Sequence, residues 1–389
     1  MKPISAIPHR WLTIGIVACS FLMLARPAAA QPLSAFEGDY IFWGYPASYL
    51  GYQSKVAFPL IDRMLAANPP AHDITPARQL TLVALDQFLH DPDYSRKDDF
   101  YSFVNTRFCH ALAAMDKPVI AGVKVIKVYN SGFVLKTLKT TVAIDIIRGG
   151  SNYKPFMSDS VFYELVSRCD ALLITNQDNK HADRKVAEAF LNAGKPVYLP
   201  TGLWTNLGDD VHYVGADTVQ TVDANGMLLH VLPGHNGKTR NNIYIMDFQG
   251  RGMVAHTGAQ DNDADWDWLS DIHNQYAIDL LITKSANINL ADMLTAFAPR
   301  VLIPAHENEM ESTVDKRDAY WAVQKRMNSL SAQDIPYVVM AWGEAFDYAD
   351  TASENISSSA NKVFINGKVY IERKGVIYTP TGIKVNESH

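Results

Sequence analysis

The order of strand-like and helix-like segments constrains the fold of this 389-residue chain more than any other feature. Between residues 119 and 345, β-branched, alternating segments are followed by alternating helix and strand patterns, and this succession occurs twice. The strand groups that open the two halves are residues 122–129 and 140–145, then 227–232, 242–247 and 253–256. Strands followed by αβ units, twice over, indicate two sheets packed together with helices outside. We therefore expect an α/β fold, an αββα two-sheet sandwich.

The αβ units that follow each strand group have the expected lengths of short helices and buried strands. The first unit is predicted as strand 171–175, helix 184–193 and strand 196–199. The second section is predicted as helix 265–273, strand 278–283, helix 290–297, strand 300–304, helix 315–330 and strand 336–340. Each half therefore supplies its own sheet and its own covering helices.

Two additions flank the domain at 119–345. Residues 31–118 contain apolar positions at helical spacing over 55–67, 76–90 and 98–115, which predicts an N-terminal helical addition. Residues 346–389 begin with a Ser- and Ala-rich linker and continue with two alternating runs around Asn366-Gly367. Asn-Gly between alternating runs is typical of a two-residue hairpin turn. The tail is therefore predicted to be a C-terminal β-hairpin.

The first 30 residues have the pattern of a secretion signal. A basic start precedes an apolar run from Trp11 to Ala25, and small residues end the segment at Ala28-Ala29-Ala30. The run is shorter than the roughly 20 residues that span a bilayer, and no later segment replaces it. We expect a mature chain that begins at Gln31, has no membrane span and is periplasmic or secreted. A lipoprotein site at Cys19 is the rival interpretation, and it is disfavoured because the apolar run continues past that residue.

Charge and cysteine usage restrict the partners and the covalent chemistry. Removing residues 1–30 deletes three basic residues and no acid, so the net charge of −6 becomes −9. An acidic surface repels phosphates and disfavours a nucleic-acid partner, which leaves a small-molecule substrate or ligand. Cys109 and Cys169 remain after cleavage, either as a disulfide or, as we favour, as two free thiols. Nothing in the sequence indicates an oligomeric state.

Three histidines lie in loops that directly follow predicted strands. They are His181 after 171–175, His235 after 227–232, and His306 after 300–304. Strand ends converge on ligand sites in α/β architectures. One such histidine alone is more typical of a surface or core position, whereas three in the same context indicate a site. The nearby Glu307, Glu309 and Glu311 alternate as in a solvated face.

At these loops the chain resembles the metallo-β-lactamase superfamily, in particular its ascorbate-6-phosphate lactonase-like branch. The resemblance covers residues 121–342. The motifs that carry it are Asp170-Ala-Leu-Leu-Ile-Thr-Asn-Gln-Asp-Asn-Lys-His181, Pro233-Gly-His235, Val254-Ala-His-Thr-Gly258 and Arg300-Val-Leu-Ile-Pro-Ala-His306. The resemblance implies a metallo-β-lactamase-like αββα sandwich with a metal-dependent hydrolytic site at the strand ends.

The metal-ligand motif of that family is partly replaced in this chain. Where the family has H-x-H-x-D-H, Asn176 and Asp178 stand at the first two histidines, Lys180 at the aspartate and His181 at the last histidine. Ala259 stands at the bridging aspartate. The resemblance therefore implies a degenerate metal-binding motif.

The resemblance implies a first metal position formed by Asn176, Asp178 and His235, with His181 and His306 as ligand candidates of the second. An amide, a carboxylate and an imidazole can still hold one divalent ion, such as zinc or manganese. The second position loses both carboxylates and gains an ammonium that repels a dication. We therefore expect at most one divalent metal, or none.

Two functions follow from these alternatives. With one metal, the chain is a hydrolase of an ester, lactone or amide, in which His181, His306 and Lys180 act as acid, base or anion-holding groups. Without a metal, the same residues form a cationic pocket and the chain is a non-catalytic binding module for a small carboxylate or phosphate. The retained ionic ligand Asp178 beside three histidines favours the hydrolase.

Overall fold

The computed structural model describes most of the chain from residue 46 onwards. Described are residues 46–378 apart from 93, 95–97, 151–153, 209, 216–219, 225, 331–334, 350–359, 366–367 and 374–375. The predicted export signal, residues 1–30, lies outside the described residues, as does most of the predicted linker. Among the described residues, none of the helices combines the length and apolarity that crossing a bilayer requires.

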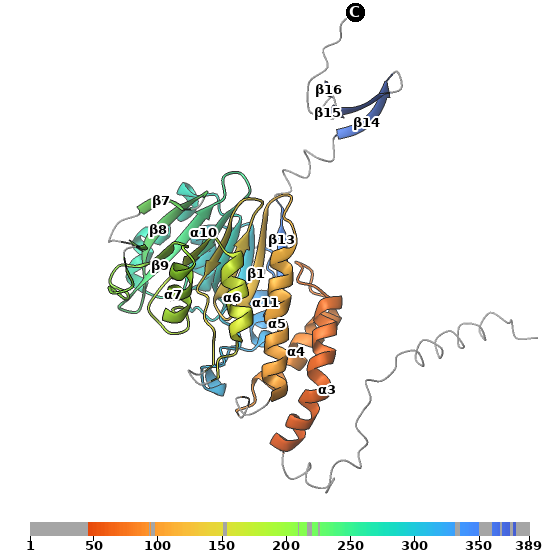
Figure 1. The fold of residues 1–389 in the computed structure, drawn as a ribbon, viewed down its shortest axis with the longest axis vertical. Coiled ribbons are helices and arrows are strands. Elements are labelled where there is room, and N and C mark those ends of the chain that lie inside the picture. Colours follow the sequence, from red (N-terminus) through yellow and green to blue (C-terminus); the bar gives the residue numbers. More distant parts are fainter. Residues whose placement is uncertain are drawn as a thin grey trace, which may run out of the picture. The chain divides into compact units, whose positions relative to one another are not determined.

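The chain divides into two compact units, residues 1–57 and 58–389. In the first unit the described residues form the beginning of helix α3 (Pro46–Ala67). The other helices lie in the second unit (Figure 1). They are α4 (Pro76–Leu89), α5 (Asp98–Asp116), α6 (Asp159–Arg168), α7 (Arg184–Asn192), α8 (Trp266–Leu269), α9 (Ile272–Gln275), α10 (Leu290–Phe297) and α11 (Tyr320–Ser329). Helix α6 was not predicted.

The first sheet has seven strands in the order β13-β1-β2-β3-β4-β5-β6. Their bounds are β1 (Val123–Tyr129), β2 (Gly132–Lys136), β3 (Thr141–Ile144), β4 (Ala171–Leu173), β5 (Val197–Pro200), β6 (Val211–Val214) and β13 (Ala345–Tyr348). The segment between the first two predicted strands is itself a strand, β2, which pairs antiparallel with both neighbours. β13 pairs antiparallel with β1, so residues 346–348 belong to this sheet.

The second sheet has six strands in the order β12-β11-β10-β9-β8-β7. Their bounds are β7 (Gln220–Ala224), β8 (Met227–Asn236), β9 (Thr239–Asp247), β10 (Met253–His256), β11 (Leu280–Lys284) and β12 (Val301–Ala305). The predicted strand at 336–340 is wrong, because only Tyr337 forms a bridge, to Leu302. The chain leaves the sheet there and turns at Gly343, whose φ is 74°.

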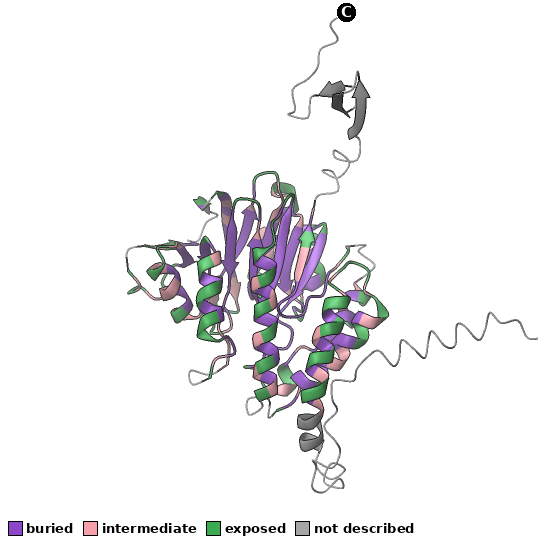
Figure 2. Ribbon diagram, turned by 45° about the vertical axis from the view of Figure 1, so that its right-hand side comes forward, coloured by how far each residue is buried: buried purple, intermediate pink, exposed green. Residues whose placement is uncertain are grey.

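The core lies between the two sheets. Val125, Leu135 and Leu173 of the first sheet share one apolar cluster with Leu229 and Ile282 of the second, and all five are at most 1% exposed. Most residues of the central strands of the two large sheets are buried (Figure 2), which is typical of sheets covered on both faces. α5, α6 and α7 lie side by side against the first sheet (Figure 1). The mixed α/β fold with two packed sheets and outer helices confirms the predicted fold class.

The helical addition is anchored to the sandwich by two buried arginines. Thr75 caps α4 by accepting a hydrogen bond from the Arg78 backbone N–H, and the Arg78 guanidinium donates to both carboxylate oxygens of Glu344 and to the Val339 carbonyl. Arg107 on α5 donates through Nε to the Trp342 carbonyl, 2.7 Å away. These contacts join α4 and α5 to the segment that precedes β13.

The C-terminal segment forms a separate small sheet. β14 (Ala360–Ile365) pairs antiparallel with β15 (Lys368–Arg373), as the predicted hairpin requires. A third strand, β16 (Val376–Tyr378), which was not predicted, pairs antiparallel with β15. The tail is thus a three-stranded meander.

Candidate functional site

Loops from both sheets meet at one end of the sandwich. Ser131, in the turn between β1 and β2, donates through Oγ to the Lys180 carbonyl in the loop after β4. The backbone N–H of His306, directly after β12, donates to the carbonyl of Asn130 in the same turn. The loop with His181 and the loop with His306 therefore both contact the β1–β2 turn, as convergence at strand ends predicts.

His181 is held by a buried carboxylate. Its Nδ1 lies 2.7 Å from Asp145 Oδ2, and the ring is 2% exposed. Thr175 donates to Asp145 through both its backbone N–H and its hydroxyl. Burial raises the pKa of Asp145, but the charge and hydrogen bond of His181 outweigh it, so the pKa lies below its usual range. The carboxylate orients the imidazole and leaves its Nε2 for other chemistry.

His306 is held in the same way by a different acid. Its Nδ1 lies 2.6 Å from Glu309 Oε1, and its Nε2 is buried with no hydrogen-bond partner among the described residues. The His306 and His181 rings are 4.9 Å apart, centroid to centroid. Burial outweighs the hydrogen bond of Glu309 and lowers the pKa of His306 below its usual range. The two imidazoles form a buried pair whose anchored nitrogens are their Nδ1 atoms.

Lys180 forms an ion pair with the acid that holds His306. Its Nζ lies 2.7 Å from Glu309 Oε2. Burial lowers the pKa of Lys180, but the Glu309 carboxylate outweighs it, so the pKa is raised. The pKa of Glu309, which burial raises, is held far below its usual range by His306 and Lys180. Lys180 therefore keeps Glu309 ionised, and Glu309 in turn orients His306.

Asn176 and Asp178 make hydrogen bonds that stabilise the loop after β4. The Asn176 side chain accepts from the Asp178 backbone N–H and donates to Asn241 Oδ1, 3.0 Å away. Asp178 is exposed and accepts from the Lys180 backbone N–H at 3.0 Å. These are turn-forming hydrogen bonds of the kind that Asn and Asp make in loops.

His235 lies at the end of β8 with its own carboxylate partner. Its Nδ1 is 3.0 Å from Asp265 Oδ1, and its backbone N–H donates to Gln260. Its side chain is 34% exposed, in contrast to the two buried histidines. The structure thus brings together His181, His306 and Lys180. It places His235 with Asp265, whereas Asp178 bonds within its own loop.

The carboxylates that hold the three histidines were not among the predicted site residues. Asp145 was predicted only as the end of a strand, and Asp265 only as the start of a helix. Glu307 and Glu309 were expected on a solvated face, which is wrong, because they are 0% and 8% exposed. The alternation after His306 comes from a turn with left-handed residues at His306 and Asn308, not from an exposed helix or strand. For Glu309, the signal available in the sequence was its position three residues after His306.

The arrangement does not fit a resident metal ion. Within the part of the chain that the structure describes, no three His, Cys, Asp or Glu side chains are grouped so that they could hold one. The His181 and His306 rings bring together two imidazoles, whereas catalytic zinc sites use three protein ligands. Carboxylate-anchored imidazoles occur in metal sites but also in general-base histidines. The residues present can therefore act as an acid and a base.

His256 contributes a pH dependence to folding. The ring is 1% exposed, and its Nε2 donates to the Ser131 carbonyl while its Nδ1 accepts from the Gly258 N–H. Burial lowers the pKa of His256 to about 4. Because the unfolded state takes up a proton near pH 6.5 and the folded state does not, stability falls as the pH drops from about 6.5 to 4, by about 3 kcal/mol.

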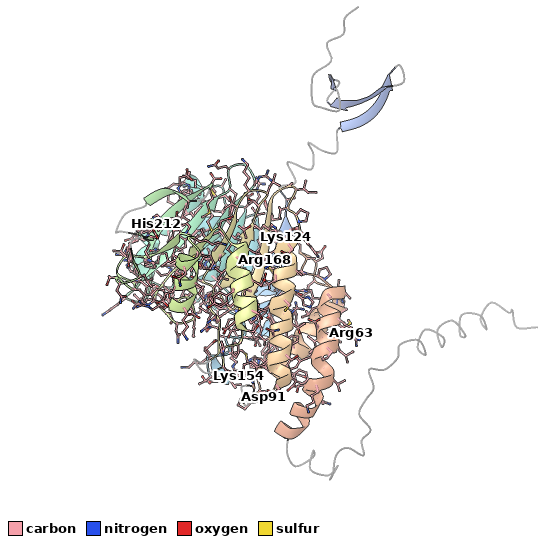
Figure 3. The ribbon with its side chains drawn as sticks, viewed as in Figure 1. Arg63, Asp91, Lys124, Lys154, Arg168 and His212 are labelled. Carbon is pink, nitrogen blue, oxygen red and sulfur yellow. The ribbon has the colours of Figure 1, made fainter. Side chains whose placement is uncertain are left out.

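We expect urea unfolding of the wild type to show this loss, and the His256→Asn variant to show a correspondingly smaller slope of stability against pH over the same range. Parallel slopes for the two proteins would contradict the assignment. His212→Asn is a suitable control, because His212 is exposed on β6 (Figure 3).

A cleft of about 790 Å³ is lined in part by the loop that carries Lys180 and His181. Asn179 and Ala182, on either side of Lys180 and His181, are among its lining residues. Its charged lining consists of Arg148, Asp183, Arg184, Lys185, Glu188 and Glu311. The cleft has room for a small polar molecule and presents charges of both signs.

Comparison with known proteins gives matches at the level of structure. No protein-family model matches the chain, and no curated protein matches it. A possible metal-dependent hydrolase from Veillonella parvula matches with 15% identity and a TM-score of 0.48, over 59% of this chain and 100% of that one. A metallo hydrolase from the archaeon Ignicoccus hospitalis matches with 18% identity and a TM-score of 0.46, over 58% and 99%. A putative Zn-dependent hydrolase of the metallo-β-lactamase superfamily from Thermotoga maritima matches with 13% identity and a TM-score of 0.32, over 52% and 85%.

Proposed function

We propose that this chain is a hydrolase of small acyl compounds, an ester, lactone or amide, with His181 and His306 as its acid–base groups. The observation that carries the proposal is the buried pair itself. The two rings lie 4.9 Å apart and each is held through Nδ1 by its own carboxylate. An imidazole oriented in this way has its Nε2 available as a general base near neutral pH.

The reaction needs only water as a second reactant. One imidazole Nε2 removes a proton from a water molecule as its oxygen attacks the carbonyl carbon. The tetrahedral intermediate then expels the alcohol or amine, which takes the same proton back from the imidazolium. The second imidazole hydrogen-bonds to the attacking water and to the leaving group, and so assists the transfer of the proton between them. Asp145 and Glu309 stabilise the imidazolium that forms on each histidine, because each already accepts from Nδ1.

The family assignment is part of this proposal. We place the chain in the metallo-β-lactamase superfamily, near the ascorbate-6-phosphate lactonase-like branch, with a motif in which Asn176, Asp178 and Lys180 replace ligands. Supporting it are the strand order around the loops and the sequence motifs that end in His181, His235 and His306. We further propose that the protein is exported, acts on a small molecule and binds no nucleic acid.

A second candidate, a metal-free binding module for a small anion, is favoured by one observation. Arg148, Arg184 and Lys185 line the cleft that adjoins the loop of Lys180 and His181. Asp183 and Glu188 offset part of that charge, through pairing with Arg148 at 3.6 Å and with Arg184 at 2.8 Å. Anion binding without turnover of any acyl compound would favour this function.

The proposal predicts hydrolysis without a tightly held metal pair. We expect the purified, untagged protein to hydrolyse p-nitrophenyl acetate and to contain at most one divalent ion per chain by elemental analysis. Because the acid–base groups are side chains, extensive dialysis against EDTA should leave the rate within about twofold, whereas a metal-activated water would be lost with its ion. Two tightly held ions, with activity that vanishes on their removal and returns with zinc, would overturn the metal-free mechanism.

A further inference from the structure

Asn130 is a buried amide for which the described chain supplies no partner. It occupies the turn between β1 and β2, is 0% exposed, and neither its Oδ1 nor its Nδ2 has a hydrogen-bond partner among the described residues. Leaving a buried polar group unpaired costs about 1 to 3 kcal/mol, and folded proteins pair nearly all such groups. The amide therefore has donor and acceptor capacity available for a molecule that is not part of the chain.

The backbone places Asn130 next to the segments that carry the two proposed acid–base histidines. Its carbonyl accepts from the His306 N–H at 3.4 Å, and the side chain of the next residue, Ser131, lies 3.3 Å from His181 Nδ1. His306 Nε2 is likewise buried without a hydrogen-bond partner among the described residues. Asn130 and His306 also both have left-handed backbones, with φ of 58° and 71°. Such conformations concentrate at functional sites.

The proposed reaction lacks one component, a donor for the oxygen on which negative charge develops. Lys180 is a nearby cation, but its ammonium lies 2.7 Å from Glu309 and forms an ion pair with that carboxylate. His181 and His306 are assigned to proton transfer. The Asn130 amide, uncharged and buried, is suited to the task, because preorganised amide donors stabilise such an oxyanion.

We propose that Asn130 is a catalytic residue whose Nδ2 donates to the carbonyl oxygen of the acyl substrate, where negative charge develops. The inference rests on the proposed hydrolase function and deepens it. Asn130 Oδ1 is left to accept a hydrogen bond from the same ligand, so the favoured class is an acyl compound with a donor beside its carbonyl, as in a carboxamide.

Asn130→Gly is the informative variant, because glycine adopts a left-handed turn conformation at no steric cost and removes only the amide. We expect kcat for p-nitrophenyl acetate to fall by about 100- to 1,000-fold, as when one oxyanion donor is removed, while KM stays within about threefold. The melting temperature should not fall. Gln249→Gly is the matched control, since Gln249 has φ of 52° in an exposed turn after β9, and it should retain the wild-type rate.

A binding measurement separates this inference from the proposed function. Acetamide should shift the side-chain amide signals of Asn130 in NMR spectra of the full chain, identified by their absence in the glycine variant. If the wild type hydrolyses no ester but acetamide still shifts those signals, the hydrolase proposal fails and the Asn130 site stands. If hydrolysis requires the histidines but is unchanged in Asn130→Gly, or if acetamide leaves the signals in place, the inference is overturned.

Discussion

The Glu344→Gln variant is expected to lose about 3 to 5 kcal/mol of its free energy of unfolding. Glu344 is 6% exposed and accepts from the Arg78 guanidinium, which is 2% exposed, and from the Ala341 N–H. Neutralising the carboxylate leaves a buried guanidinium without its counter-charge, where desolvation is not offset. Because this ion pair joins α4 to the segment before β13, we expect the loss to appear in urea unfolding as a lower midpoint.

The control is the same substitution at an exposed ion pair. Glu164 pairs with Arg168 on α6 (Figure 3), and these side chains are 58% and 27% exposed. Glu164→Gln should change the unfolding free energy by no more than about 1 kcal/mol, because surface ion pairs are screened by water. Equal losses in the two variants would show that the Arg78–Glu344 pair is not the anchor of the helical addition.

Replacing His181 or His306 by glutamine is expected to lower kcat/KM for p-nitrophenyl acetate by about 100- to 10,000-fold, the usual contribution of a positioned acid or base. Glutamine retains a hydrogen-bonding group but cannot take up a proton at neutral pH. The kcat/KM of the double variant should be little lower than that of the less active single variant, since the two rings act on one proton transfer. Steady-state rates on the full chain give the measurement.

His212→Gln serves as the control, because His212 is exposed on β6 and stacks on Tyr198 (Figure 3). It should retain the wild-type rate. Hydrolysis that persists in both His181→Gln and His306→Gln would remove these residues from the reaction. Retained anion binding together with absent turnover in the wild type would identify the chain as a binding module.

Most of the fold could be predicted from the sequence, because strand and helix periodicities are local properties. The predicted segments 253–256 and 290–297 coincide with β10 and α10. β2 and β13 were missed for a physical reason. β2 follows a turn of only two residues, Asn130 and Ser131, in which the left-handed φ of Asn130 reverses the chain, and β13 is a short strand that forms only because β1 offers it an edge.

The candidate site was predictable as residue types at strand ends, but not as a set of partners. The sequence by itself determined that His181, His235 and His306 follow strands, that Lys180 stands beside one of them, and that the chain contains two strand-rich halves. Only the tertiary structure decided that His181 and His306 form a pair, with Asp145 and Glu309 on their Nδ1 atoms, while His235 bonds to Asp265. Hydrogen bonds between side chains far apart in sequence depend on loop conformation and on the packing of two sheets, and no local pattern encodes either.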